Sequence, residues 1–215
     1  MSDASIRMDR IYRWQTGLYD VTRRYYLLGR EPLIEAMAPP EGAKVLEIGC
    51  GTGRNLVKAA CRWPDARFFG IDVSQAMLGK AHEAIARARL SGRVSLGLAD
   101  ATSFDAGDVL GERNFETIYF SYTLSMIPDW RNVLERAADM LPPGGILLVT
   151  DFGSLNGLPA FLSRPLLAWL SLFSVTPNHS FEAEFSKIAL SRGFHCNFIS
   201  LYRGYSFLAT MRRPE

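Results

Sequence analysis

The chain has few cysteines, little excess charge and no long uninterrupted apolar run. Its 215 residues include three cysteines, Cys50, Cys61 and Cys196, which are too few and too scattered for a disulfide framework or a zinc cluster. They fit a reducing compartment. The net charge of +2 is too small for a dedicated nucleic-acid-binding protein. We therefore expect no nucleic acid partner and no metal, and the sequence gives no indication of the oligomeric state.

No segment has the features of a membrane span or a secretory signal. The first ten residues lack an apolar core, so no secretory signal is predicted. The longest apolar stretch, 158–175, is interrupted by Pro159, Arg164 and Pro165. No uncharged apolar run reaches the roughly 18 residues that cross a bilayer. We expect a soluble or membrane-peripheral protein.

Short apolar runs alternate with helical patterns along most of the chain. Strands are predicted at 44–49, 66–72, 93–100, 115–123 and 144–152, and helices at 55–63, 74–90 and 131–141. This alternation predicts βαβ units and a parallel sheet covered on both faces. Residues 194–202 and 205–213 flank a short turn and predict an antiparallel hairpin at one sheet edge. We expect a helical N-terminal cap over 1–38 and a single α/β core over 39–215.

The strongest chemical signal is a glycine-rich turn directly after the first predicted strand. Glu47, Gly49, Gly51 and Gly53 form the pattern ExGxGxG. Glycines there let the backbone approach a ligand closely, and the next helix presents free N–H groups. The alternative is a tight turn without a ligand. Asp72 closes the second strand, where a carboxylate suits the two hydroxyls of a ribose.

A second acidic residue, Asp100, ends the third predicted strand. It can accept a hydrogen bond from an exocyclic amine such as adenine N6; the alternative is that it caps residues 101–105. The acidic Glu47 at the start of the turn favours a cationic ligand over a pyrophosphate. Dehydrogenases that bind NAD carry GxGxxG rather than ExGxGxG, which disfavours them here. Because the acidic and glycine positions are intact, a non-catalytic scaffold is also disfavoured.

Together the ExGxGxG turn, the acid after the second strand and the acid after the third resemble the class I S-adenosylmethionine (SAM) methyltransferases over 40–152. The resemblance implies a Rossmann-like seven-stranded sheet of order 3-2-1-4-5-7-6, SAM as cofactor and S-adenosylhomocysteine as product. It implies that Met77 packs on adenine and that Ser121 faces the sulfonium. The residues implied to bind SAM are Glu47, Gly49, Cys50, Gly51, Gly53, Asn55, Asp72, Val73, Met77, Asp100, Ala101 and Ser121.

In this fold the acceptor pocket is built from the N-terminal segment and the stretch after the fifth strand. The N-terminal segment interleaves aromatic residues with arginines. Aromatic faces attract methylated ammonium groups, and arginines bind carboxylate or phosphate groups. The alternative is an amphipathic helix with aromatics in the core and solvated arginines. The expected substrate-binding residues are Tyr12, Arg24, Tyr25, Tyr26, Arg30 and Arg164.

Three segments, 19–31, 46–56 and 122–131, resemble the bacterial betaine-lipid N-methyltransferases, which trimethylate diacylglyceryl-homoserine. Phosphatidylethanolamine N-methyltransferases share parts of this pattern, and quinone or small-amine acceptors stay open. The resemblance implies a lipid substrate at the membrane surface, contact with anionic phospholipid, and a cytoplasmic enzyme peripheral to the inner membrane. Residues 158–175 would then form a lid or an interfacial helix, or else a helix covering the core.

An amine acceptor must lose one proton before each methyl transfer. The candidate proton acceptors are Tyr19, Tyr122, Asp151 and His179. Tyr19 is preferred because the resemblance places it over the cofactor. After the fourth strand stands Ser121-Tyr122-Thr123, which lacks the Pro-Pro-Tyr motif of enzymes that methylate a planar base nitrogen.

Overall fold

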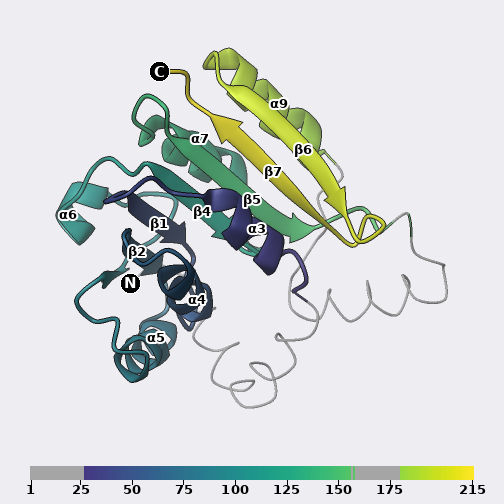
Figure 1. The fold of residues 1–215 in the computed structure, drawn as a ribbon. Helices are drawn as coiled ribbons and strands as arrows, with labels where there is room; N and C mark the ends of the chain where they lie inside the picture. The colour runs from purple at the N-terminus through teal and green to yellow at the C-terminus, as the bar shows by residue number, and fades with distance from the viewer. Residues whose placement is uncertain (1–26, 156, 158–179) are drawn as a thin grey trace.

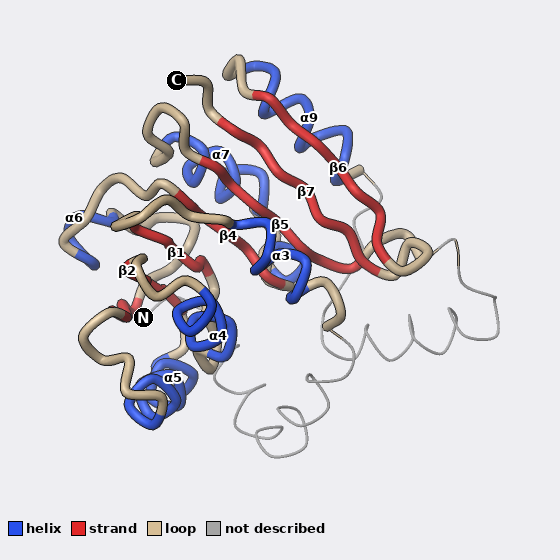
Figure 2. The backbone as a smooth tube through the Cα atoms, in the orientation of Figure 1, coloured by secondary structure: helices blue, strands red, loops and turns tan. Residues whose placement is uncertain are grey.

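A single seven-stranded sheet organises the chain in the computed structural model, which describes residues 27–155, 157 and 180–215 (Figure 1). The strand order is β3-β2-β1-β4-β5-β7-β6, and Figure 2 shows the strands side by side. β1 to β5 are parallel, whereas β7 is antiparallel to both β5 and β6. The predicted sheet, its order and the edge hairpin are confirmed. The strands are β1 Lys44–Ile48, β2 Arg67–Asp72, β3 Val94–Leu98, β4 Thr117–Ser121, β5 Ile146–Phe152, β6 His195–Leu201 and β7 Ser206–Arg212.

Helices cover both faces of the sheet. On one face lie α3 (Arg30–Met37), α4 (Arg54–Arg62) and α5 (Gln75–Arg87), and their apolar residues form one core with the strands. On the other face lie α6 (Ala106–Leu110), α7 (Trp130–Asp139) and α9 (Phe181–Ser191), which form a second core. Because both faces are covered, every residue of the central strands β4 and β5 is buried. None of the described helices is long and apolar enough to cross a membrane.

The helix α9 is an element that the strand-and-helix pattern did not single out. Phe181, Phe185 and Ile188 recur at helical spacing and are all buried. The ring of Phe181 lies 5.2 Å from that of Trp130 on α7 and 4.7 Å from that of Phe207 on β7. The helix therefore covers the hairpin half of the sheet. Its periodic signal was present in the sequence.

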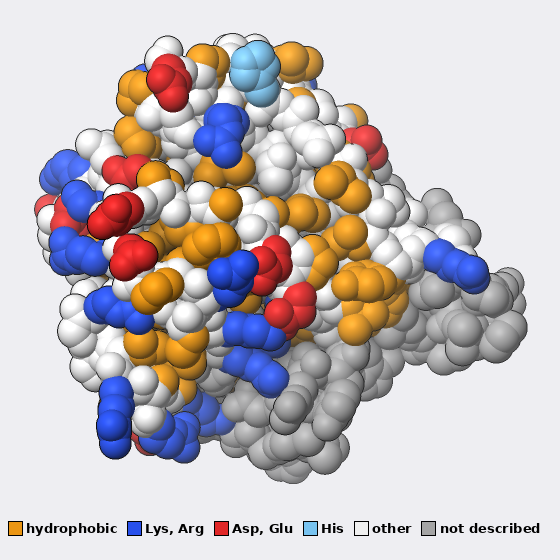
Figure 3. Space-filling model, in the orientation of Figure 1, with side chains coloured by type: hydrophobic (Ala, Val, Ile, Leu, Met, Phe, Trp, Pro, Cys, Tyr) orange, Lys and Arg blue, Asp and Glu red, His pale blue; other side chains and the backbone are white. Residues whose placement is uncertain are grey.

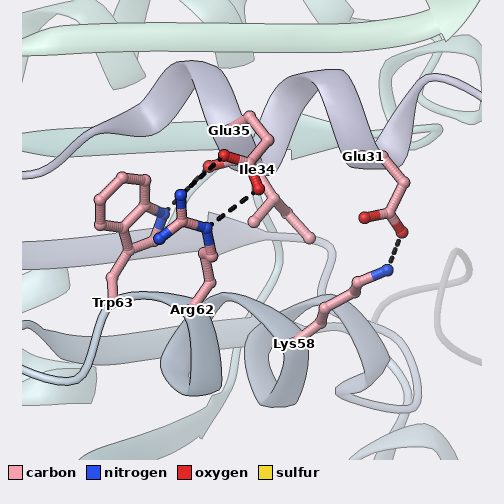
Figure 4. A network of polar contacts seen from close by, with 6 residues as sticks. All are labelled: Glu31, Ile34, Glu35, Lys58, Arg62 and Trp63. Carbon is pink, nitrogen blue, oxygen red and sulfur yellow. Dashed lines mark hydrogen bonds and ion pairs between the residues drawn. The ribbon is translucent and has the colours of Figure 1, made fainter.

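Helix α3 belongs to the covering layer, although its residues fall in the segment predicted as a cap. Its side chains Leu33, Ile34 and Met37 are buried against the sheet and α4. Figure 4 shows α3 and α4 lying side by side, with polar contacts between them. These contacts join Arg62 to Glu35 at 3.0 Å, Lys58 to Glu31, and Trp63 Nε1 to the carbonyl oxygen of Ile34 at 3.0 Å. The boundary after residue 38 stays a prediction, since 1–26 lie outside the described residues.

Candidate cofactor and acceptor site

A cavity of about 820 Å³ lies at the carboxyl ends of β1, β2 and β4. The strand order reverses between β1 and β4, which is where open α/β sheets bind their ligands. The volume falls within the range of small-molecule sites. Of the predicted cofactor residues, those that line the cavity are Glu47, Gly49, Cys50, Gly51, Asn55, Asp72, Val73, Asp100, Ala101 and Ser121. Gly53 and Met77 do not line it.

The glycine-rich turn shapes one wall of this cavity. The backbone N–H groups of Gly49 and Cys50 both donate to the carbonyl oxygen of Ile71, at 2.9 Å each. Gly49 has φ +76°, and a Cβ there would collide with Thr123. Gly51 has φ +55°, but a Cβ there would meet no atom within 4 Å, although the residue lines the cavity. The turn thus leaves open the space that a bound cofactor needs.

Two carboxylates hold the loops around the cofactor end of the cavity. Asp72 accepts hydrogen bonds from the backbone N–H of Gly51 at 2.8 Å and of Ser74 at 2.9 Å. Asp100 Oδ1 accepts from both the backbone N–H and the hydroxyl of Thr102, at 2.9 and 2.7 Å. Asp100 therefore caps the following turn and also lines the cavity, so its two alternative roles are compatible. Contacts of either carboxylate to ribose or adenine stay predictions.

Glu47 is a buried acid on the cavity wall, with 1% of its surface exposed. Its carboxyl group accepts from Asn55 Nδ2 at 2.9 Å and from the Tyr119 hydroxyl at 3.0 Å. Burial outweighs these bonds and raises the pKa of Glu47 to about 8. Tyr119 was not foreseen as a partner, because the β1–β4 register that places it opposite Glu47 cannot be read from the sequence.

Ser121 ends β4 with a buried hydroxyl that lines the cavity. Among the described residues its Oγ has no hydrogen-bond partner. A buried hydroxyl without a partner is costly, so a ligand atom that bonds to it would be favoured. With the open space at Gly51 and the acid Glu47, the donor and acceptor set fits SAM. Glu47 would face the amino group, and Ser121 would lie near the reacting end.

The part of the cavity lining that is predicted to face the acceptor combines apolar side chains with one arginine and one tyrosine. Leu27, Arg30, Tyr122, Met126 and Ile127 line it. The Tyr122 hydroxyl accepts from the backbone N–H of Gly29 at 3.0 Å. Burial raises the pKa of Tyr122 to about 12, so the phenol keeps its proton at neutral pH. The positive charge of Arg30 lowers the pKa of both Glu47 and Tyr122, which places its guanidinium within electrostatic reach of both.

Asp151 is buried and does not line the cavity. Its carboxylate accepts from the backbone N–H of Ser125 at 3.0 Å and of Phe152 at 2.8 Å. Burial raises its pKa to about 6. These bonds fix the short helix η1 (Leu124–Met126), whose last residue lines the cavity. The geometry thus gives Asp151 a structural role, and its role as proton acceptor stays a prediction.

Several predicted site residues lie outside the described part of the chain. They are Tyr12, Tyr19, Arg24, Tyr25, Tyr26, Arg164 and His179, with the apolar segment 158–175. Conversely, the cavity is lined by residues that the motifs did not indicate: Leu27, Thr52, Arg54, Val57, Ile71, Lys80, Glu83, Ala84, Arg87, Ala99, Thr102, Thr123, Met126, Ile127, Pro128 and Asp129. Many of them follow strand ends or flank the glycine turn, and that position is the signal that could have found them.

Comparisons with known proteins agree with this fold. Residues 45–145 match the methyltransferase domain family. The chain is 35% identical to the trans-aconitate 2-methyltransferase of Methylobacterium radiotolerans over 139 residues, which is 63% of this chain and 48% of that protein. The chain spans about half the length of the curated relatives it matches.

Two solved structures show the same fold at low sequence identity. The putative methyltransferase of Haloferax volcanii in complex with the Trm112 activator has a TM-score of 0.71 at 18% identity, covering 94% of this chain and 97% of that one. The phosphoethanolamine N-methyltransferase 2 of Haemonchus contortus, in complex with SAM, has a TM-score of 0.69 at 17% identity, covering 86% and 52%. Residues 45–145 therefore match a methyltransferase domain, in a chain with the class I methyltransferase fold; SAM is the methyl donor typical of that class.

Proposed function

We propose that the chain is a SAM-dependent N-methyltransferase that adds three methyl groups to the amine of diacylglyceryl-homoserine. The resemblance of 19–31, 46–56 and 122–131 to betaine-lipid enzymes supports the acceptor class. The observation that carries the proposal is Arg30. It is the cation that α3 brings to the cavity, whereas the other cavity-lining cations of the described residues come from α4 and α5. One guanidinium binds one carboxylate bidentately, which suits a head group with a single carboxylate beside its amine.

SAM supplies an electrophilic methyl group when it is bound. The acceptor amine first loses a proton; its lone pair then forms the N–C bond as the C–S bond breaks, and the electron pair stays on sulfur. The protein orients the amine in line with that bond and excludes water. The Tyr122 phenol, with its pKa at about 12, is protonated and does not act as the base. Each methyl transfer releases one proton, which Tyr19 or His179 would take in this proposal.

A second candidate function is O-methylation of a small carboxylic acid. The relatives named trans-aconitate 2-methyltransferase favour it. A carboxylate oxygen is already a nucleophile at neutral pH and needs no base, and Arg30 would again bind an acidic group. Arg30, however, is the one of the four cavity-lining cations of the described residues that comes from α3, and three carboxylates would have to share it at this end. A monocarboxylate fits this end better.

An acceptor competition tests the two functions. Purified protein receives isotopically labelled SAM with mixed micelles of diacylglyceryl-homoserine and phosphatidylethanolamine, together with trans-aconitate, and the products are read by mass spectrometry. Gain of three methyl groups on the homoserine lipid supports the proposal. Labelling of phosphatidylethanolamine alone or of trans-aconitate alone rejects it in favour of that acceptor. Arg30→Gln should abolish selection of the carboxylate-bearing lipid, whereas the matched variant Arg54→Gln should keep it.

A lipid acceptor also requires contact with a membrane. Lys and Arg side chains gather over α4 and α5 in the lower part of Figure 3. Lys58 and Arg62 on α4 pair with Glu31 and Glu35 of α3, whereas Arg54 on α4 with Lys80 and Arg87 on α5 outnumber Glu83, the one carboxylate of α5. Such a surface supports attraction to anionic phospholipid, and we propose a cytoplasmic enzyme peripheral to the inner membrane. Flotation with anionic vesicles should therefore weaken at high salt. Flotation that ignores both salt and lipid charge would contradict this contact.

A further inference from the structure

Tyr122 has an unusual backbone conformation directly after β4. Its φ of +55° lies in the left-handed region, which bulky residues rarely adopt and which persists only when the surroundings hold it. Its backbone N–H donates to the carbonyl oxygen of Thr150 at 2.8 Å. Its ring packs edge-on against Phe152, with 4.8 Å between centroids. This conformation turns the side chain to the start of α3, 93 residues away in sequence.

The start of α3 is a buried helix end that needs a hydrogen-bond acceptor. The N-cap residue is Gly29, and its buried N–H donates to the Tyr122 hydroxyl at 3.0 Å. A Cβ at Gly29 would collide with Thr150 Oγ1 and lie 3.2 Å from the Tyr122 oxygen. The backbone of Gly29 thus lies directly against β5 and Tyr122. The contacts drawn in Figure 4 join α3 to α4 at Glu31 near its start and at Ile34 and Glu35 further along.

We propose that Tyr122 is a positioning residue for the acceptor: its hydroxyl fixes the start of α3 so that Leu27 and Arg30 form the acceptor wall of the cavity. Arg30 follows Gly29 directly, so any displacement of the Gly29 backbone displaces the guanidinium that binds the acceptor's carboxylate. Tyr122 therefore acts on recognition of the acceptor rather than on removal of its proton. The inference rests on the proposed function insofar as the acceptor binds at Arg30.

The test replaces Tyr122 by Phe, which keeps the ring and removes the hydroxyl. Tyr202→Phe is the matched control, because Tyr202 also has a positive φ (51°) but is 49% exposed and does not line the cavity. With diacylglyceryl-homoserine in mixed micelles, Y122F should raise the acceptor KM about fivefold to tenfold, as for one lost buried hydrogen bond. Its kcat and its Kd for SAM should stay within about twofold of the parent. A fall in kcat at unchanged KM would show a role in chemistry and overturn the inference.

A double-mutant cycle tests whether Tyr122 acts through Arg30. Arg30→Gln leaves the bond between Tyr122 and Gly29 in place. If Tyr122 positions Arg30, the double variant should raise the KM little beyond R30Q alone, because the two effects share one cause. If the factors by which Y122F and R30Q each raise the acceptor KM multiply fully in the double variant, the inference is overturned.

Amide hydrogen exchange separates this inference from the proposed function, because it needs no acceptor. In Y122F the amides of residues 29–33 should exchange at least about tenfold faster, since Gly29 N–H has lost its acceptor and the helix end opens more readily. Tyr202→Phe should leave them unchanged. Unchanged exchange in Y122F would overturn the inference even if the lipid is methylated. Faster exchange would support it even if the acceptor proves to be another carboxylate.

Discussion

Replacing Glu47 by Gln should remove a loss of stability that the parent shows as the pH rises, and it should also weaken the binding of SAM. The pKa of Glu47 is raised from 4.5 to about 8, chiefly by burial. In the unfolded chain the carboxyl ionises near pH 4.5, whereas in the folded protein it stays protonated until about pH 8. The contribution of Glu47 to the free energy of unfolding therefore has its full value below pH 4.5 and decreases as the pH rises from 4.5 to 8.

The size of this loss follows from the pKa values. Each pH unit between them costs about 1.4 kcal/mol, so between pH 5.5 and pH 8 the parent loses about 3 kcal/mol through Glu47. A glutamine has no charge to bury at any pH. Its amide can direct the oxygen to Asn55 and an N–H to Tyr119, so the variant keeps both neighbours. The free energy of unfolding of Glu47→Gln minus that of the parent should therefore increase by about 3 kcal/mol over this range.

Urea denaturation at pH 5.5, 7 and 8 measures that difference, because all other titrating groups cancel. Glu83→Gln is the control for removing a carboxyl group at the same cavity, because Glu83 is exposed. Titration calorimetry above pH 8, where the Glu47 carboxyl group is ionised, should show SAM affinity reduced about tenfold or more in Glu47→Gln, the cost of losing a charged partner for the amino group. Parallel pH curves for the parent and the variant would refute the reasoning.

The remaining predictions concern the glycine turn, a second buried acid and the α3 core. Gly51→Ala should weaken SAM binding while costing only about 1 kcal/mol of stability, because its Cβ enters open space at φ +55°. In Gly49→Ala the Cβ collides with Thr123, so this variant should cost more stability. Calorimetry with and without SAM checks both variants. Because the pKa of Asp151 is raised from 3.8 to about 6, the parent should lose about 3 kcal/mol of stability between these pH values, and Asp151→Asn should not show this loss. Urea denaturation at several pH values measures both, and an equal change of unfolding free energy with pH in parent and variant would contradict this. Leu33→Ala should cost about 2–5 kcal/mol because the side chain is fully buried, while Leu190→Ala, at 70% exposure, should cost almost nothing by the same assay.

The local pattern of the sequence determined the sheet and the position of the turn. Apolar runs such as 44–49 and 66–72 form strands that are buried on both faces. They can be recognised in the sequence because parallel strands are covered on both sides and are therefore apolar almost throughout. The turn could also be recognised in the sequence, because its positive φ angles at Gly49, Gly51 and Gly53 favour glycine at these positions. Both signals depend on residues close together in the chain.

Only the tertiary structure decided which distant groups meet. The register between β1 and β4 sets Tyr119 opposite Glu47, and the placement of α3 brings Gly29 to Tyr122. Asp151, which like Asp72 lies near a strand end, does not line the cavity and instead accepts a hydrogen bond from the backbone N–H of Ser125. Strand register and helix docking are fixed by packing summed over both cores, so no short motif encodes them. The sequence by itself therefore determined the sheet and its glycine-rich turn, while packing decided the ionisation of Glu47 and the cavity wall that Leu27, Arg30 and Tyr122 form.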